Sequence, residues 1–353
     1  MDQVELGRSG IRVSAVCLGT MTFGNQTGQK DAFAQMDRAL DAGISFLDTA
    51  EMYPVNPVRK ETVGNSERMI GAWLAARGNR AKVQIATKIA GPGNMQVRNG
   101  QGYDGGNVGT QIDVSLSRLG VDVIDLYQLH WPSRGSYAFR QNWGYDPSRI
   151  DPGKTLAEMA DMIGALQKAV DAGKIRAFGL SNDSAWGTIR WIDTAARLGG
   201  PRVASVQNEY SLLNRHYDTD MAEMAIAEGV TLLSYSPLAA GLLTGKYQNG
   251  AVPPGSRVAV DIANGGAGHL GGRKTDRAFG AVAAYQDLAN RLGWDLIHMA
   301  NAWGLARPFP VIPIIGATSD DQLAHNLAGI EKRLSAEEVA EINLVHRAWP
   351  MPY

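Results

Sequence analysis

Short apolar runs alternate with amphipathic segments along almost the whole chain. The apolar runs are rich in Val, Ile and Leu, and the segments between them repeat apolar residues with the period of an α-helix. This alternation predicts a parallel sheet covered by helices, because neighbouring parallel strands are joined by crossover helices. Eight strands are predicted, at residues 15–18, 46–48, 83–87, 124–128, 175–179, 203–208, 231–235 and 311–314.

Helical patterns follow each of the first six predicted strands. They cover residues 30–42, 66–77, 108–119, 155–172, 185–198 and 219–228. A glycine stands after each, where a left-handed C-cap is expected: Gly43, Gly78, Gly120, Gly173, Gly199 and Gly229. An open, doubly wound sheet more often stops at roughly five to seven strands, so eight repeats favour a closed (β/α)8 TIM barrel. We expect residues 1–353 to form one barrel domain.

Three segments do not follow this alternation of strands and helices. Residues 4–13 predict an N-terminal β-hairpin with its turn at Ser9 and Gly10. Residues 131–152 form a long aromatic loop after the fourth strand, on the predicted catalytic face. Residues 248–274 contain too much glycine and too few apolar residues for regular structure, which predicts a mobile loop. Loops of this length in compact domains are usually lids, binding segments or connectors.

The composition fits a globular enzyme of the cytoplasm. The 353 residues are 44% hydrophobic and 20% charged, which excludes disordered and fibrous classes. A net charge of -1 provides no basic field, so we expect no nucleic-acid partner. Cys17 is the only cysteine, which rules out an intramolecular disulfide and a cysteine-based metal site, and no metal is expected. We find no targeting segment and no membrane-length apolar run, and homo-oligomerisation stays open.

Four polar residues follow neighbouring predicted strands. Asp48 ends the second strand and Tyr53 follows it, Lys88 comes after the third strand and His130 after the fourth. Catalytic groups of such barrels lie at these C-terminal strand ends. Taken singly, each has a simpler explanation: a helix cap, a packed tyrosine, a solvated lysine or a structural histidine. Their coincidence at three adjacent strand ends predicts a site.

Together the four groups can protonate a carbonyl oxygen. Hydride addition to a carbonyl carbon puts negative charge on the oxygen, and a proton donor must meet that charge. A free tyrosine has a pKa of about 10 and is a poor donor at neutral pH. We expect Lys88 to lower the pKa of Tyr53, Asp48 to keep Lys88 charged and in place, and His130 to orient the carbonyl.

The same residues resemble the catalytic tetrad of the aldo-keto reductases. The resemblance lies in residues 46–53, the pair Thr87-Lys88 and the pair Leu129-His130. Residues 18–24, 174–182, 206–214 and 234–247 resemble further family segments in the family's order, most closely in the Tas-like and potassium-channel β-subunit branch. The resemblance implies NADPH-dependent reduction of an aldehyde or ketone to an alcohol, with Asp48, Tyr53, Lys88 and His130 as the tetrad.

It also implies a dinucleotide site without the glycine-rich fingerprint of an open sheet. By similarity, Gln207, Ser181 and Asn182 hold the carboxamide and Tyr235 stacks on the nicotinamide. The loop after Tyr235 wraps the pyrophosphate, which gives its small residues a reason to be small. The full set expected to contact NADPH is Gly19, Thr20, Met21, Asp48, Ser181, Asn182, Gln207, Tyr235, Ser236, Pro237, Leu238, Ala239, Gly241, Leu243, Gly245, Lys246, Arg257, Ile315, Gly316, Thr318, Gln322 and Asn326.

The adenosine end of that site is expected near residue 320. Thr318, Gln322 and Asn326 share one helical face by their four-residue spacing. Lys246 and Arg257 are expected to pair with a 2′-phosphate, which favours NADPH over NADH.

The substrate is expected to be a small carbonyl compound with aromatic or hydrophobic character. Met21, Tyr53, Trp131, Trp143 and Tyr145, with Trp349 from the tail, are expected to form an apolar cup, although core packing explains each tryptophan equally well.

Two other functions stay open at this stage. Lys88 at a barrel strand end is compatible with the Schiff-base chemistry of class I aldolases. An NADPH-binding regulatory subunit with little turnover is compatible with the β-subunit resemblance.

Overall fold

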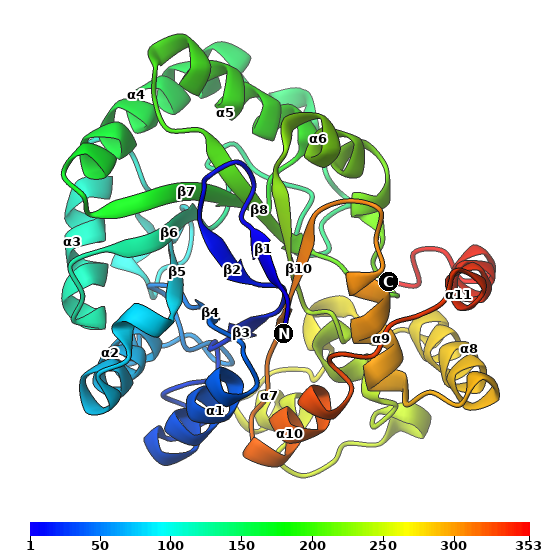
Figure 1. Cartoon of the computed structure of the whole chain (residues 1–353). Helices are drawn as coiled ribbons and strands as arrows, with labels where there is room; N and C mark the ends of the chain where they lie inside the picture. The colour runs from blue at the N-terminus through cyan, green and yellow to red at the C-terminus, as the bar shows by residue number, and fades with distance from the viewer.

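The computed structural model, which describes residues 1–353, is a closed barrel of eight parallel strands (Figure 1). The strands close in the order β10-β3-β4-β5-β6-β7-β8-β9. They are β3 (Cys17–Gly19), β4 (Phe46–Asp48), β5 (Gln84–Ile89), β6 (Ile124–Leu129), β7 (Ile175–Ser181), β8 (Val203–Glu209), β9 (Thr231–Tyr235) and β10 (Val311–Ile315). All eight predicted strands and the TIM barrel are confirmed, and the open sheet is excluded.

Helices surround the barrel and cover its outer surface (Figure 1). They are α1 (Gln29–Asp41), α2 (Asn65–Arg77), α3 (Val108–Leu119), α4 (Pro152–Asp171), α5 (Ala185–Leu198), α6 (Asp220–Glu228), α7 (Arg257–Ala263), α8 (Asp276–Leu292), α9 (Leu296–Leu305), α10 (Asp320–Ala328) and α11 (Ala336–Ala348). The six predicted helices α1 to α6 are confirmed. Each of their six glycines has a positive φ, between 60° and 83°, as the C-cap prediction requires. Helices α8, α9 and α11 carry no prediction.

The predicted hairpin closes one end of the barrel. Its strands β1 (Gln3–Glu5) and β2 (Arg12–Ser14) pair antiparallel and cross the barrel's end in Figure 1. Leu6, Ile11 and Val13 are buried in a cluster with inward-facing strand residues such as Phe46 and Leu126. This apolar plug fills the N-terminal end of the barrel, so the opposite end, where the strands finish, is the one available to a ligand.

The prediction of an irregular segment over residues 248–274 is wrong in part. Helix α7 lies within it and is N-capped by Ser256, whose side chain accepts a hydrogen bond from the backbone NH of Ala259. Val258 and Leu270 are buried and anchor the segment against the core. The glycines make its turns, because residues such as Gly265 have positive φ. A few anchoring residues therefore order a segment whose average composition is that of a loop.

Short 3-10 turns occupy other connections. They are η1 (Arg80–Lys82), η2 (Arg98–Gly100), η3 (Pro147–Arg149), η4 (His216–Asp218), η5 (Ala239–Thr244), η6 (Gln248–Gly250) and η7 (Leu270–Gly272). The predicted long loop after β6 runs to the start of α4 and contains only η3. No helix has both the length and the apolar composition that crossing a bilayer requires.

Candidate active site

The four residues of the predicted tetrad lie together at the C-terminal end of the barrel. Asp48 ends β4, Lys88 lies near the end of β5, and His130 directly follows β6. Tyr53 comes from the loop after β4. Because β4, β5 and β6 are hydrogen-bonded neighbours, their ends bring these side chains to one place. All four residues are buried.

The Lys88 ammonium is fully engaged inside the protein. Its Nζ donates to Asp48 Oδ2 at 2.7 Å, to the Thr49 carbonyl at 2.6 Å and to the Tyr53 hydroxyl at 3.4 Å. Burial alone lowers the pKa of Lys88, but Asp48 and then Tyr53 more than offset it, so that pKa lies above its ordinary value. Lys88 is therefore a fixed positive charge beside the Tyr53 hydroxyl.

Tyr53 keeps its proton at neutral pH. Burial raises the pKa of Tyr53, and the opposing effect of Lys88 is smaller, so the net shift is upward. The prediction of a lowered pKa is wrong in sign, because the sequence does not reveal how completely the hydroxyl is desolvated. Lys88 still acts in the predicted sense, because its positive charge lowers the pKa of Tyr53 and favours the phenolate.

His130 is a neutral imidazole facing Tyr53. The two rings meet edge to face, with centroids 5.8 Å apart. Burial, and then the charge of Lys88, hold the pKa of His130 well below its ordinary value. The buried Nδ1 of His130 has no hydrogen-bond partner within the protein. The ring can thus serve as a hydrogen-bonding group without carrying charge.

Two glutamine side chains hold the other oxygen of Asp48. Gln207 Nε2 donates to Asp48 Oδ1 at 2.8 Å, and Gln128 Nε2 donates to the same oxygen at 3.3 Å. Gln207 Nε2 also donates to Gln128 Oε1 at 3.2 Å. Both amide protons of Gln207 are thereby used, which leaves its Oε1 free to accept from a ligand. Gln128 is absent from the sequence prediction, although a glutamine within a buried apolar strand was the available signal.

Asn182 joins three strand ends. Its Nδ2 donates to the His130 carbonyl at 2.9 Å and to Ser181 Oγ at 3.0 Å, and its Oδ1 accepts from the Tyr235 hydroxyl at 2.8 Å. This network sets the positions of the loop after β6, the end of β7 and the end of β9 relative to one another.

A cavity of about 1480 Å³ opens at this end of the barrel and includes Asp48, Tyr53 and His130 in its wall. Its volume exceeds the roughly 300–1,000 Å³ of most small-ligand pockets, which leaves room for a dinucleotide together with a substrate. The predicted cofactor residues that line it are Gly19, Met21, Asp48, Ser181, Asn182, Gln207, Tyr235, Ser236, Pro237, Leu238, Gly241, Lys246, Arg257, Ile315, Gly316, Thr318, Gln322 and Asn326.

Four predicted cofactor residues do not line the cavity. Ala239 and Leu243 are fully buried and pack into the hydrophobic core. Thr20 is buried and donates its hydroxyl to the Asp48 carbonyl at 2.9 Å. Gly245 directly follows η5 as its C-cap, with a φ of 73°. These residues shape the loops that line the cavity, and the family resemblance could not separate the two roles.

The predicted adenosine residues meet at the start of α10. The helix begins at Asp320 with Ser319 as its N-cap, so Thr318 lies outside it. The backbone NH and the hydroxyl of Thr318 both donate to Gln322 Oε1 at 3.1 Å. Asn326 lies one turn further along and donates to the Gln322 carbonyl at 2.9 Å. All three border the cavity, although only two of them share a helical face.

Two cations in the cavity wall have no anionic partner. Neither Lys246 nor Arg257 makes an ion pair, although every other arginine that lines the cavity does. Burial and then the charge of Arg273 lower the pKa of Arg257 to about 10, and burial followed by Arg257 lowers the pKa of Lys246. Unpaired, desolvated cations are what a phosphate-bearing ligand would neutralise.

A buried carboxylate, which the sequence did not predict as a site residue, connects three segments at the rim of the cavity. Glu209, at the end of β8, accepts from Arg273 Nε at 2.7 Å, from Arg140 Nη1 at 3.1 Å and from the Tyr353 hydroxyl at 3.2 Å. These partners come from the loop after β6, from the segment after α7 and from residue 353. Each partner is separated from Glu209 by between 64 and 144 positions along the chain, so local sequence patterns do not predict this network.

The predicted substrate cup is only partly formed. Met21, Tyr53 and Trp131 line the cavity, whereas Trp143 is 70% exposed and lies away from it. Tyr145 packs edge to face on Tyr137 at 6.0 Å and is also outside the cavity wall. The prediction is wrong for these two, because the loop turns their side chains away from the barrel. Trp349 packs against Gly280 of α8 instead.

Comparison with known proteins shows which family and which relatives the chain is similar to. The sequence model of the Aldo/keto reductase family matches residues 15–347. The chain is 41% identical to "Protein tas" of Escherichia coli over 100% of this chain and 99% of that protein. It is 31% identical to "Uncharacterized oxidoreductase YrpG" of Bacillus subtilis, over 97% of this chain and 95% of that protein. It is 30% identical to "Probable voltage-gated potassium channel subunit beta" of Oryza sativa subsp. japonica, over 99% of this chain and 98% of that protein.

Proposed function

Because the chain belongs to the aldo/keto reductase family, we propose that it reduces an aldehyde or ketone to an alcohol with NADPH as hydride donor. The observation that carries the proposal is the arrangement of Asp48, Lys88 and Tyr53. A protonated phenol in the cavity wall lies 3.4 Å from a buried ammonium whose charge a carboxylate secures.

When bound in this cavity, NADPH would supply the hydride for the carbonyl carbon. Tyr53 donates its proton to the carbonyl oxygen, and Lys88 stabilises the resulting phenolate by its positive charge. His130, held neutral, donates a hydrogen bond that orients the same oxygen. General acid catalysis of this kind contributes roughly 10²–10⁴-fold to the rate.

The cavity supports this choice of cofactor. The free Oε1 of Gln207 is an acceptor suited to a carboxamide NH2, and Tyr235 offers an aromatic ring in the same wall. Lys246 and Arg257 meet the negative charge of a 2′-phosphate, which favours NADPH over NADH. Thr318 and Gln322 contribute polar groups for the adenosine.

We further propose that residues 1–353 act as one domain on a hydrophobic carbonyl substrate. The hairpin plugs the barrel, and Tyr353 reaches Glu209 at the rim, so both termini belong to the same unit. Met21 and Trp131 supply apolar surface beside Tyr53 in the cavity wall.

The structure disfavours a Schiff-base aldolase. All three Nζ donors of Lys88 are engaged, and its raised pKa keeps the amine protonated, so it is a poor nucleophile.

A regulatory subunit with little turnover is the second candidate, favoured by the likeness to the rice protein named as a channel β-subunit. The two functions predict opposite results in a turnover assay.

The test is an NADPH-oxidation screen of the purified chain across aldehydes and ketones, with the alcohol product identified by mass spectrometry. The proposal predicts turnover of hydrophobic carbonyls. Tight NADPH binding without consumption on any substrate would overturn it in favour of the regulatory function.

A further inference from the structure

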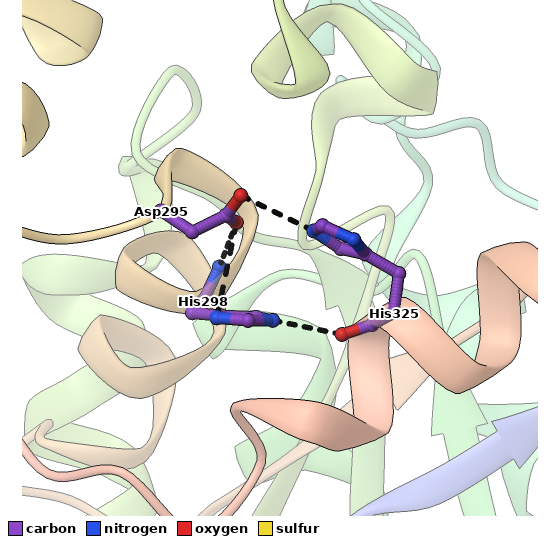
Figure 2. A group of neighbouring side chains, drawn as sticks. All are labelled: Asp295, His298 and His325. Carbon is purple, nitrogen blue, oxygen red and sulfur yellow. Dashed lines mark hydrogen bonds and ion pairs between the residues drawn. The ribbon is translucent and has the colours of Figure 1, made fainter.

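Three side chains that the proposed reduction does not use converge near the start of α9. Asp295 is the N-cap of α9, His298 lies in its first turn, and His325 belongs to α10 (Figure 2). One ligand atom from each lies within 4.8 Å of the others. The two imidazole rings stack with centroids 5.0 Å apart.

His298 presents an unprotonated nitrogen to this group. Its Nε2 lies 2.8 Å from the His325 carbonyl, which can only accept, so Nε2 carries the proton. In the neutral ring, Nδ1 therefore has a free lone pair, and it has no hydrogen-bond partner. His298 is only 7% exposed, and its ring packs directly on Gly329, which fixes its orientation. A metal-ligating histidine is usually oriented by such a hydrogen bond from its other ring nitrogen.

Asp295 and His325 complete the group. Asp295 Oδ1 accepts from the backbone NH groups of Ile297 and His298 at 2.9 and 3.1 Å, which orients the carboxylate. Its Oδ2 lies 3.2 Å from His325 Nε2 (Figure 2). His325 is half exposed, so its side chain can move and the site is open to solvent.

We propose that Asp295, His298 and His325 bind one divalent transition-metal ion, with zinc as the best match. Two imidazole nitrogens and one carboxylate oxygen suit zinc and its neighbours, whereas magnesium and calcium prefer all-oxygen sets. Tetrahedral zinc with bonds of about 2.0–2.1 Å needs ligand atoms about 3.4 Å apart. Asp295 Oδ2 lies 3.2 Å from His325 Nε2, and Asp295 Oδ1 lies 4.0 Å from His298 Nδ1. Binding therefore requires the Asp295 carboxylate to turn toward His298 and the half-exposed His325 ring to rotate out of its stack on His298. The fourth position stays open to water.

This proposal revises the expectation that the chain holds no metal. That expectation rested on the absence of paired cysteines, and His298 and His325 are 27 positions apart with no spacing motif between them. His325 also lines the rim of the large cavity beside Gln322. A bound ion would therefore lie outside the tetrad, on the α9–α10 side of that cavity.

The alternative is a hydrogen-bonded helix cap with no affinity for metal. Isothermal titration separates the two, using the full chain without a histidine tag, treated with chelator and titrated with ZnCl2. The proposal predicts one saturable zinc site. With Co²⁺ in place of zinc, visible ligand-field bands typical of low coordination number are expected.

Two variants remove ligands with little risk to the fold. His325→Gln changes a half-exposed side chain, and Asp295→Asn keeps an N-cap of equal quality. Each is expected to weaken zinc binding at least roughly tenfold and to lose the cobalt bands, with an unchanged Tm in chelator. His269→Gln, at an exposed histidine outside the group, is the matched control and should bind as the wild type does. The absence of a saturable site, or an affinity within about twofold of wild type in either ligand variant, overturns the proposal.

Discussion

Replacing Lys88 by methionine tests how Tyr53 works as an acid. The ammonium lies 3.4 Å from the Tyr53 hydroxyl. At an effective dielectric constant of about 20, a unit charge at that distance stabilises a full phenolate by about 5 kcal/mol. With proton transfer about half complete in the transition state, about half of this is lost, which corresponds to roughly a hundredfold lower kcat. The Tyr53 hydroxyl itself stays in place.

The same substitution leaves Asp48 as a buried carboxylate without its cation. Removing one partner of a buried ion pair costs about 3–5 kcal/mol of unfolding free energy, so the single variant is expected to be less stable. The double variant Lys88→Met with Asp48→Asn removes the stranded charge and should recover much of that stability without recovering activity. Stopped-flow NADPH oxidation gives the rate, and urea denaturation gives the stability. A single variant within about fivefold of the wild-type rate, or a double variant with restored turnover, would refute this role for Lys88.

Three further outcomes are expected. Arg257→Met should raise the KM for NADPH at least about tenfold and should raise the KM for NADH much less, as measured by initial rates with both cofactors. Equal increases in the two KM values would contradict pairing of Arg257 with a 2′-phosphate. Trp143→Ala should leave the ranking of carbonyl substrates unchanged because its side chain is 70% exposed, whereas Trp131→Ala should alter it; a change with the first variant alone would show that the cavity wall is wrongly assigned. The free energy of unfolding should fall as the pH drops below about 6.5. Burial holds the pKa of His130 well below that value and lowers the pKa of His346 to about 4, so the unfolded chain binds more protons than the folded one. Urea denaturation between pH 7 and pH 5 measures this slope, and a flat or opposite slope would contradict the prediction.

The parts of the structure that repeat along the chain were predictable. Strands such as β10 are continuous apolar runs because they are buried on both faces, and the helices between the strands show the helical period. The proximity of Asp48, Lys88 and His130 was predictable because Asp48 ends a predicted strand and the other two follow the next two strands, and barrel closure brings such ends together.

Features that depend on distant contacts were not predictable. Glu209 and Arg273 find each other only once the barrel and the later loops have formed. The raised pKa of Tyr53 depends on burial, which a residue's identity does not reveal. Trp143 and Trp131 lie in the same aromatic loop, yet only the second lines the cavity, because the path of the loop decides which side chain turns inward.

The central claim is that Tyr53 donates the proton in carbonyl reduction while other residues hold NADPH. The most direct measurement compares the wild type with Tyr53→Phe, using NADPH fluorescence for binding and single-turnover oxidation with a hydrophobic aldehyde for chemistry. Only the transition state uses the phenol proton, so the variant should bind NADPH almost as the wild type does and lose at least about a hundredfold in turnover rate. Turnover near the wild-type rate, or loss of NADPH binding in place of turnover, would contradict the account.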